Sequence, residues 1–319
     1  MSFETISEAL ARQRAYSDHF FDTGSLSERE REEITKTFAL SLHAEVSEIA
    51  SAINFKDHRR TVLPVDRNKL LYKSVDAFRY ILAVLNLWDI DAQTFIEACE
   101  DKDLFLHRRH AEGEAPWDGR PVVVFDVDDV IAEFRSGFFS YLFSKWGIRA
   151  DLNDRQYYST AELQAVGLDS DTAFSSFISD GGFRSLEVCR EAVDAMDQCR
   201  QEGYWVQLLT ARPAANLKCF YDTHHWLHQM AIPYDRLAFS PEKYLWLTGQ
   251  EFFAAGKVAC VIDDSSKHSA EFAKHGVRAI VPIKPYNEDV QGIQGITRLD
   301  LSSVGTQGLL EAVRRATPP

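Results

Sequence analysis

The feature that most constrains how this chain folds is a short apolar run that ends in acidic residues. The segment 121–129 reads PVVVFDVDD, so the apolar residues are followed directly by Asp126, Asp128 and Asp129. A run that is apolar at every position is typical of a strand buried on both faces of a parallel sheet. Three later segments have the same character and predict further strands of this kind: 204–210, 257–264 and 277–283.

Segments with helical character separate these runs. Residues 186–202, 214–230 and 266–275 are expected to be helices, and Gly203 and Gly276 follow the first and the last of them. Glycine is common directly after a helix because it adopts a left-handed backbone without strain. Strands that alternate with helices predict an α/β, Rossmann-like parallel sheet, and in such sheets ligands bind at the carboxyl ends of the strands.

The first hundred residues differ, because their apolar side chains recur every three or four positions. These intervals predict helices over 28–54, 69–88 and 91–106, with no apolar strand-like run before Pro121. At 319 residues the chain is long enough for two domains. From His107 onward, charged residues, Pro and Gly accumulate as in a linker. The expected division is an all-α domain over 1–110, a linker over 111–120 and an α/β domain over 121–319.

The overall charge argues against some partners. The chain has 48 acidic and 35 basic residues and a net charge of −13, and such a surface binds long nucleic acid and anionic membranes poorly. Its 5 cysteines are far apart and odd in number, which favours reduced thiols. The sequence has no apolar run of signal-peptide or membrane-span length. The expected location is therefore the cytoplasm, with no membrane partner.

Acidic and hydroxyl side chains follow the predicted strands. Asp126 and Asp128 lie two residues apart after the first strand, a spacing that in extended backbone places both carboxylates on the same side. Thr210 ends the second strand, and Asp263 with Asp264 end the third. A single aspartate at a strand end is common in turns, but the ordered set is not. The set suits a Mg²⁺ site beside a carboxylate that attacks phosphorus, with a second carboxylate that moves the proton.

The motifs FDVDDVIAEF (125–134), LLTARP (208–213) and VIDDS (261–265) together resemble those of the haloacid dehalogenase-like phosphatases. The resemblance covers about residues 121–285. It implies that Asp126 is the nucleophile that becomes an aspartyl-phosphate, and that Asp128 is the general acid and then the base. It also implies a phosphoryl contact from Thr210. The Mg²⁺ ligands that it implies are Asp126, Asp263, Asp264 and the backbone carbonyl of Asp128.

Two positions leave alternatives open. The family usually has Gly or Thr after its second aspartate, whereas this chain has Asp129, which would either cap the loop or repel a highly charged substrate. The family also needs a lysine beside the nucleophile, and both Lys243 and Lys257 are candidates. We favour Lys243, at the start of a predicted helix after a short strand over 236–239. Lys257 precedes the third strand and would lie roughly 15–20 Å from Asp263.

The segment between the first motif and the second strand, about 136–184, is expected to form a small cap over the site. The sequence GGFRSLEVCREAVDAM, 181–196, resembles the deoxyribonucleotidase branch of the same superfamily. In that branch, cap aromatics stack on the base, a role that Phe138, Phe139 or Phe183 would take here, with core packing as the alternative for each. The resemblance makes Arg212 and Phe183 the expected substrate-binding residues.

The all-α domain carries an acidic pattern of its own. Glu45 and Glu48 lie one turn apart and Asp76 lies on the next long helix, an arrangement that holds cations inside helical bundles. Over about 28–106 the pattern resembles the all-α nucleoside triphosphate pyrophosphatases, including MazG and the dimeric dUTPases, whose acids bind Mg²⁺ and the triphosphate. Lys73 stands where that family has another acid. We expect it to pair with Glu45 or Glu48 and to leave the domain weakly active or inactive.

The favoured function is a Mg²⁺-dependent phosphatase for a nucleoside or deoxynucleoside monophosphate. It would be fused to a nucleotide-binding or weakly active pyrophosphatase domain, through which the chain forms a homo-oligomer. A phosphatase for DNA 3′ ends or for a non-nucleotide phosphate is the catalytic alternative. The alternative from a different class is a non-catalytic nucleotide-sensing scaffold. Hydrolysis of a panel of phosphomonoesters separates the three.

Overall fold

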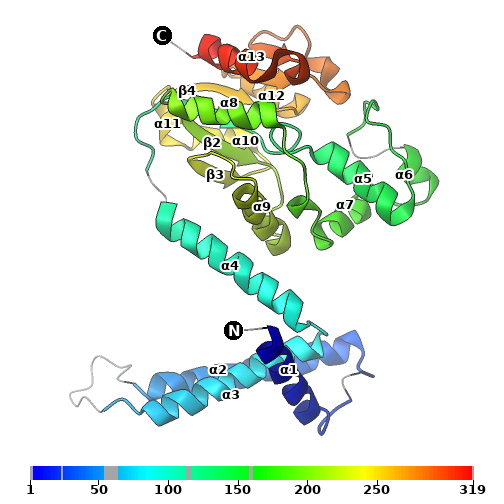
Figure 1. The fold of residues 1–319 in the computed structure, drawn as a ribbon, viewed down its shortest axis with the longest axis vertical. Helices are drawn as coiled ribbons and strands as arrows, with labels where there is room; N and C mark the ends of the chain where they lie inside the picture. Colours follow the sequence, from blue (N-terminus) through cyan, green and yellow to red (C-terminus); the bar gives the residue numbers. More distant parts are fainter. Residues whose placement is uncertain (1–2, 23, 54–63, 113–115, 158–160, 318–319) are drawn as a thin grey trace. The chain divides into compact units, whose positions relative to one another are not determined.

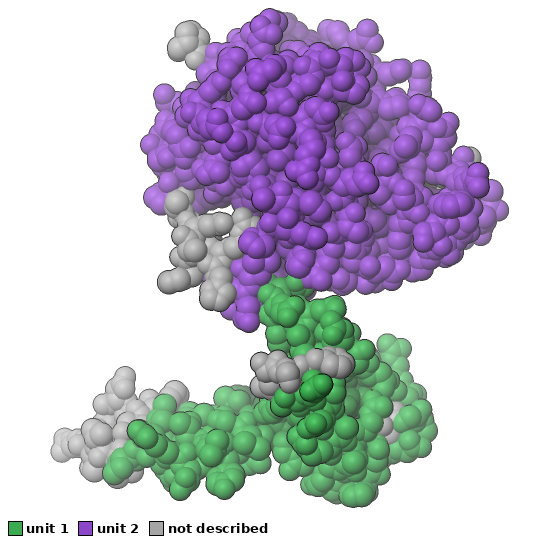
Figure 2. Space-filling view, in the orientation of Figure 1, with its two compact units in different colours: residues 1–102 green, residues 103–319 purple. Residues whose placement is uncertain are grey.

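The computed structural model describes residues 3–22, 24–53, 64–112, 116–157 and 161–317. The chain divides into two compact units, residues 1–102 and 103–319, which Figure 2 colours separately. The first is helical, and the second contains a parallel sheet with helices on its faces (Figure 1). The expected fold class is therefore confirmed. Within the described residues, every helix is too short or too polar to cross a bilayer.

The helical unit is built around an antiparallel pair of helices, α2 (Glu28–Ser51) and α3 (Arg67–Leu87). The Ser27 hydroxyl caps α2 by accepting the N–H of Glu30, whose carboxylate accepts the N–H of Ser27 in return. Asp66 caps α3 by accepting the N–H of Lys69 at 2.9 Å. The other helices of the unit are α1 (Phe3–Ser17) and residues 92–102 of α4 (Ala92–Glu112).

The helical unit has a small core. Its buried cluster comes from α1, α3 and the start of α4 and comprises Ile6, Leu10, Leu82, Leu85 and Ala92. Helix α2 contributes no buried residue, although its apolar residues recur at helical spacing. Some apolar side chains on α2 and α3 are more than half exposed, such as Leu40 (73%) and Leu71 (58%). The described unit thus leaves an apolar surface on α2 and α3 uncovered.

Of the region expected as a linker, the structure describes residues 111–112 and 116–120. Helix α4 continues to Glu112, and the division between the units falls between Lys102 and Asp103 rather than at 110. Charged residues do not exclude a helix, because Arg and Glu are good helix formers. Trp117 packs against the core of the α/β unit, and Arg120 bonds Asp235 at 3.2 Å. Residues 116–120 therefore belong to the α/β unit.

The sheet of the α/β unit has six parallel strands in the order β3-β2-β1-β4-β5-β6. The strands are β1 (Val122–Phe125), β2 (Trp205–Thr210), β3 (Arg236–Phe239), β4 (Val258–Ile262), β5 (Ala279–Pro282) and β6 (Ile296–Leu299). β1 pairs with β2 on one side and with β4 on the other, so the strand order switches beside β1. In open parallel sheets, ligands bind at the carboxyl ends of the strands at such a switch point.

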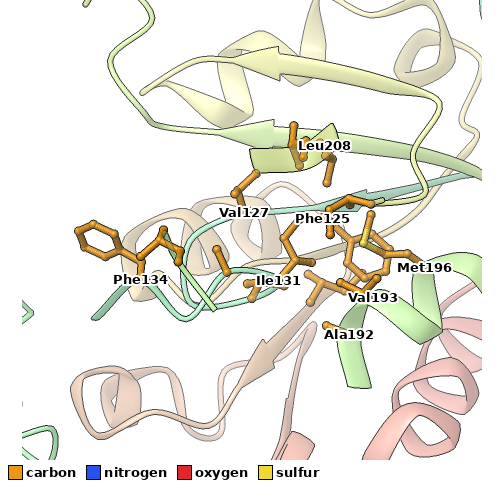
Figure 3. Packing of buried hydrophobic residues seen from close by; sticks show 14 of the residues in the cluster. Phe125, Val127, Ile131, Phe134, Ala192, Val193, Met196 and Leu208 are labelled. Carbon is orange, nitrogen blue, oxygen red and sulfur yellow. The ribbon is translucent and has the colours of Figure 1, made fainter. Parts of the chain in front are cut away.

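Alternate side chains of the buried strands face two different helical layers. Val123 and Phe125 share a core with α8 (Arg190–Gln201), α9 (Leu217–Gln229) and α13 (Leu301–Ala316). Val122 and Val124 share another with α10 (Lys243–Thr248), α11 (Glu251–Ala254) and α12 (Ser266–Lys274). Figure 3 shows Phe125 packed beside Val193 and Met196 of α8. Burial on both faces explains why β1 is apolar at every position.

The segment expected as a cap is mostly helical and rich in aromatic residues. Its elements are α5 (Phe134–Trp146), α6 (Ala161–Ala165), α7 (Ser170–Ser179) and the short helix η1 (Gly182–Arg184). Phe177 of α7 packs so closely on η1 that a Cβ at Gly182 would lie 2.3 Å from its ring. The glycine at 182 is therefore required by this contact, which brings the neighbouring Phe183 into the aromatic cluster.

Candidate active site

The first aspartate of the site is fixed by strand pairing. The N–H of Asp126 still donates to the Ile262 carbonyl of β4 at 2.9 Å, one residue beyond β1. Its carboxylate accepts the N–H of Val127 at 2.7 Å, and the residue is only 6% exposed. Asp126 thus sits on a rigid element at the switch point of the sheet, where a positioned nucleophile would have to be.

Of the two candidate lysines, the structure brings Lys243 to the aspartates. Lys243 is the first residue of α10, and its ammonium lies 2.8 Å from Asp126 Oδ1 and 2.7 Å from Asp263 Oδ2. Lys257 directly precedes β4, at the end opposite Asp263. There its carbonyl accepts the N–H of Val122 at the start of β1. Of these two lysines, Lys243 is therefore the one placed to neutralise charge beside Asp126.

Three buried carboxylates converge around that ammonium. Oxygens of Asp126, Asp263 and Asp264 all lie within 4.8 Å of one another. Burial raises the pKa of Asp126 to about 7 against the attraction of Lys243, and burial likewise raises the pKa of Asp264 well above its ordinary value. For Asp263, burial is outweighed by Lys243 and His268, which hold its pKa below the ordinary value. With one ammonium for three carboxylates, the donor set fits a hard divalent cation such as Mg²⁺.

The carboxylate of Asp128 is not part of this cluster, because it accepts hydrogen bonds from Arg212. Arg212 Nη2 donates to Oδ1 at 2.7 Å and Nε donates to Oδ2 at 3.0 Å. The guanidinium also donates to Thr223 Oγ1 at 3.1 Å and lies 4.1 Å from the ring centre of Phe183. Thr210 is fully buried at the end of β2, and its hydroxyl accepts the N–H of Arg212 at 3.2 Å. The LLTARP motif thus links the second strand to Asp128.

A cavity of about 410 Å³ opens onto Asp126, Asp128 and Lys243. Aromatic rings form much of its wall: Phe134, Tyr157, Phe174, Phe183 and Tyr286. Of the three cap aromatics expected to stack on a base, only Phe183 lines this cavity. Phe138 and Phe139 are buried in the core cluster instead, at 0% and 5% exposure, which is the packing alternative.

Asp129 caps the loop after the first motif. Its backbone has a positive φ of 54°, and its carboxylate accepts the N–H of Arg135 at the start of α5 at 3.0 Å. The Tyr286 hydroxyl reaches the carboxylates of both Asp129 and Asp264, at 3.2 and 2.6 Å. Burial raises the pKa of Asp129. Asp129 is absent from the cavity wall, so of its two expected roles the structure favours capping.

Several residues that lie at the site were not predicted from the sequence. Tyr286 follows β5, and a signal for it existed, because the carboxyl ends of all parallel strands meet at one edge of the sheet. His268, on the first turn of α12, lies 3.7 Å from Asp263 for a similar reason. Tyr157 and Phe174 come from the cap, where the sequence has no period that would separate a cavity wall from a core.

In the helical unit, Lys73 lies among the three acids expected to bind a metal. Its ammonium is 3.1 Å from Glu45, 3.1 Å from Glu48 and 3.6 Å from Asp76. Hydrogen bonds to Glu45 and then to Glu48 raise the pKa of Lys73, so the ammonium stays charged. The structure thus pairs Lys73 with both glutamates rather than with one. A metal ion in this position would have to displace the ammonium.

The fold and the order of the strand-end motifs define the α/β unit as a haloacid dehalogenase-like hydrolase domain. Residues 120–300 match the family described as 5′ nucleotidase, deoxy (pyrimidine), cytosolic type C. The chain belongs to this nucleotidase family. No curated protein matches the chain.

Several solved structures are similar to the chain. A haloacid dehalogenase family hydrolase from Deinococcus radiodurans R1, with bound phosphate and sodium, is 14% identical, with a TM-score of 0.43 over 63% of this chain and 99% of that one. A haloacid dehalogenase-like family hydrolase from Xanthomonas campestris is 14% identical, with a TM-score of 0.40 over 62% and 96%. CbbY from Rhodobacter sphaeroides, in complex with phosphate, is 18% identical, with a TM-score of 0.37 over 60% and 99%.

Proposed function

We propose that the α/β unit hydrolyses a nucleoside or deoxynucleoside monophosphate through an aspartyl-phosphate on Asp126. The observation that carries the proposal is the position of Lys243 between Asp126 and Asp263, on a cavity that Asp128 also lines. A buried carboxylate beside a fixed cation is arranged to meet the negative phosphoryl group. Membership of the nucleotidase family supports a nucleotide as the substrate.

The reaction has two steps that the chain's own residues divide between them. In the first, an Asp126 oxygen attacks phosphorus, the bond from phosphorus to the leaving oxygen breaks, and Asp128 gives that oxygen a proton. In the second, a water oxygen attacks the phosphorus of the aspartyl-phosphate, Asp128 takes the water proton, and Asp126 is released. Lys243 and the Thr210 hydroxyl would hold the phosphoryl oxygens through both steps. The net reaction consumes one water and yields an alcohol and phosphate.

The proposed cofactor is Mg²⁺, held by Asp126, Asp263, Asp264 and the backbone carbonyl of Asp128. When bound, it would offset the charge of the phosphoryl group next to Asp126. The support for this ion comes from the three carboxylates that share one ammonium. Oxygen donors of this kind are those that Mg²⁺ prefers.

Mg²⁺ is expected to stabilise the native protein as well as to activate it. At a concentration about 100 times the dissociation constant, binding to the native state alone contributes about 2.7 kcal/mol. For a unit of this size that is a rise of roughly 5–10 °C in the unfolding temperature. Differential scanning calorimetry with Mg²⁺ and with EDTA measures it. Asp263→Asn should lose the shift, and the exposed Asp171→Asn should keep it; an equal shift in both variants would contradict the site.

The aromatic wall of the cavity supports a nucleoside as the leaving group. Phe134, Tyr157 and Phe174 lie on the same cavity as Phe183, and base–aromatic stacking stabilises a bound base by about 1–3 kcal/mol. Phe183 remains the cap aromatic proposed to contact the substrate. Arg212 also lines the cavity, although its guanidinium is engaged by Asp128.

A substrate panel on the full chain tests the proposal. Release of phosphate is measured with Mg²⁺ for nucleoside 5′-monophosphates, their 2′-deoxy forms, a 3′-phosphorylated oligonucleotide, sugar phosphates and p-nitrophenyl phosphate. The nucleoside and deoxynucleoside monophosphates are expected to give the highest kcat/KM. Preference for the oligonucleotide or a sugar phosphate would overturn the substrate class but leave the chemistry intact. Release of phosphate from none of them would favour the non-catalytic scaffold.

For the helical unit we propose nucleotide binding with little or no pyrophosphatase activity. A cavity of about 520 Å³ in this unit has aromatic walls that include Tyr16, Phe38 and Tyr80, and Glu45 and Asp76 lie at its edge. Aromatic walls with a few polar groups are typical of small-molecule sites. The ion pairs of Lys73 with both of those acids argue against a metal-dependent cleavage of triphosphates.

Lys73→Glu is expected to create a four-acid site and to tighten Mg²⁺ binding to the full chain at least about tenfold, because carboxylate count sets cation affinity. Calorimetric titration of Mg²⁺ measures this, and pyrophosphate release from dUTP and dCTP measures cleavage. Lys36→Glu is the matched control, since the Lys36 side chain is 65% exposed and pairs with Glu33 on its own helix. Brisk cleavage of dUTP or dCTP by the wild-type chain would show that Lys73 does not block the site.

We also propose that the chain forms a homodimer through α2 and α3. Helix α2 buries no side chain of its own, and Val46 on α2 and Val75 on α3 are 50% and 46% exposed. Two amphipathic helices form a four-helix bundle when a second pair covers their apolar face. Light scattering on the full chain is expected to give twice the monomer mass. A monomer mass at micromolar concentration would contradict the proposal.

A further inference from the structure

We propose that Arg212 is a positioning residue, which holds the carboxylate of Asp128 in the orientation that both chemical steps need. The inference rests on the proposed function, in which Asp128 moves the protons. The family resemblance implies a different role for Arg212, a direct contact with the substrate. The two roles predict different kinetic consequences, because one acts through binding and the other through the placement of a proton donor.

The contact between the two side chains is bidentate. Nη2 of Arg212 lies 2.7 Å from Asp128 Oδ1, and Nε lies 3.0 Å from Oδ2. In this parallel arrangement the planar guanidinium fixes both oxygens and therefore the plane of the carboxylate. Among the described residues, all hydrogen bonds to the Asp128 carboxylate come from Arg212. No other group shown by the structure fixes that plane.

Arg212 is itself buried and hydrogen-bonded. Its side chain is 1% exposed, and Nη1 donates to the hydroxyl of Thr223 at 3.1 Å. Thr223 is fully buried and donates in turn to the Cys219 carbonyl of α9 at 2.7 Å. The rings of Phe183 and Trp226 lie 4.1 and 5.8 Å from the guanidinium carbon. A buried planar group near two rings, with a hydrogen bond from Nη1 to Thr223, has little freedom to rotate.

The Asp128 carboxylate needs a contact that fixes its orientation. It lies beyond the end of β1 and its side chain is 19% exposed, more than that of Asp126 at 8%. An unrestrained carboxylate there would populate several staggered rotamers, and only some would reach the leaving oxygen. Misplacement of a catalytic group by about 1 Å costs on the order of 10²-fold in rate. We therefore expect loss of the bidentate contact to lower kcat rather than substrate affinity.

The choice of leaving group separates the two steps. A nucleoside is a poor leaving group, so its release in the first step needs the proton of Asp128. p-Nitrophenolate leaves without a proton, so the first step with p-nitrophenyl phosphate does not depend on where Asp128 lies. The second step is the same for both esters and needs Asp128 to take the water proton. A misplaced Asp128 should thus slow only the second step for the aryl ester.

Arg212→Lys in the full chain tests this, because lysine keeps the charge but cannot make the bidentate contact. With saturating Mg²⁺, kcat for both esters should fall about 10–100-fold. KM for the nucleoside monophosphate should change less than about threefold, whereas KM for p-nitrophenyl phosphate should fall together with kcat because the aspartyl-phosphate accumulates. Stopped-flow mixing with p-nitrophenyl phosphate should show a burst of p-nitrophenolate that approaches one per chain and exceeds the wild-type burst. The nucleoside monophosphate should give no burst of nucleoside.

Thr223→Val is a second variant that leaves Arg212 in place but removes its buried hydroxyl partner. It should show a smaller loss of the same kind, and Thr223→Ser should restore the wild-type kinetics because it keeps the hydroxyl. Arg184→Lys is the matched control, since Arg184 lies 2.8 Å from a different carboxylate, that of Asp222. It should leave kcat and the burst unchanged.

Two results with Arg212→Lys would overturn the inference. A raised KM with unchanged kcat would make Arg212 a substrate contact. An equal loss on both esters without a burst, together with a lowered unfolding temperature, would make its role structural. Failure of the proposed function looks different, because the wild-type chain would then hydrolyse neither ester, or Asp126→Asn would still release p-nitrophenolate in a burst.

Discussion

Asp126→Asn is expected to lose nearly all phosphatase activity while it keeps the fold. The amide has almost the shape of the carboxylate but lacks the charge that attacks phosphorus. Removal of a catalytic nucleophile lowers kcat on the order of 10³–10⁶-fold. Oδ1 of Asp126 lies 2.8 Å from Lys243 and 2.7 Å from the Val127 N–H, and the asparagine carbonyl oxygen can accept both bonds. The change therefore targets chemistry rather than packing.

The measurement is steady-state release of phosphate from a nucleoside monophosphate and from p-nitrophenyl phosphate. Thermal unfolding of the same preparation shows whether the fold is kept. Asp171→Asn is the control, because Asp171 is an exposed carboxylate in the first turn of α7. Turnover of Asp126→Asn within about tenfold of wild type would remove Asp126 from the role of nucleophile.

Lys243→Met is expected to have a second large effect, on both stability and activity. Burial alone would lower the pKa of Lys243, but Asp126 and Asp263 outweigh it and hold the pKa above its ordinary value, so the ammonium is charged. Its removal leaves those buried carboxylates without their cation, which costs about 3–5 kcal/mol when a buried pair is broken. We expect this loss in the free energy of unfolding in EDTA, and a smaller loss with Mg²⁺.

Activity should fall together with stability, because the phosphoryl group would meet uncompensated negative charge at Asp126 and Asp263. Loss of one preorganised electrostatic partner typically lowers kcat by about 10²–10³-fold. Lys257→Met is the matched control, with the same chemical change at the opposite end of β4. Urea unfolding and phosphate release measure both effects. Equal effects of the two substitutions would show that Lys243 has no special part in the site.

The strand-end residues could be predicted because one physical rule applies to all of them. Parallel strands bring their carboxyl ends to one edge of the sheet, so Asp126, Thr210 and Asp263 had to meet wherever the strands paired. The same rule distinguished Lys243 from Lys257, since a lysine before a strand lies a strand's length from its end. Tyr286 and His268 obey this rule too, although the set predicted at the strand ends held only carboxylates and one hydroxyl.

Other features depend on tertiary contacts that no local pattern encodes. The sequence around a buried phenylalanine does not show whether its ring lines a cavity, as that of Phe183 does, or fills a core, as that of Phe138 does. The link from Arg212 to Asp128 joins positions 84 residues apart. Strand β6 has only partly buried or exposed residues at the sheet edge, so it lacks the apolar run that revealed the others.

In the helical unit too, the sequence pattern predicted the helices but not the contacts between them. Its spacing of apolar residues predicted the helices, but helical spacing does not say which partner covers the apolar face, and α2 buries none of its residues within the described chain. Lys73 was expected to pair with one glutamate, whereas its position between α2 and α3 brings it to Glu45, Glu48 and Asp76 together. The length of a lysine side chain permits all three contacts, and only the packing of the two helices selects them.

The most direct test of this account is to capture the phosphorylated enzyme. The full chain is mixed with a nucleoside monophosphate and Mg²⁺, quenched in acid within milliseconds, reduced with borohydride and analysed by peptide mass spectrometry. The account predicts that residue 126 is converted to homoserine, the reduction product of an aspartyl-phosphate, and that Asp126→Asn shows no such conversion. Conversion at another aspartate, or turnover without conversion at any carboxylate even in Arg212→Lys mixed with p-nitrophenyl phosphate, would contradict it.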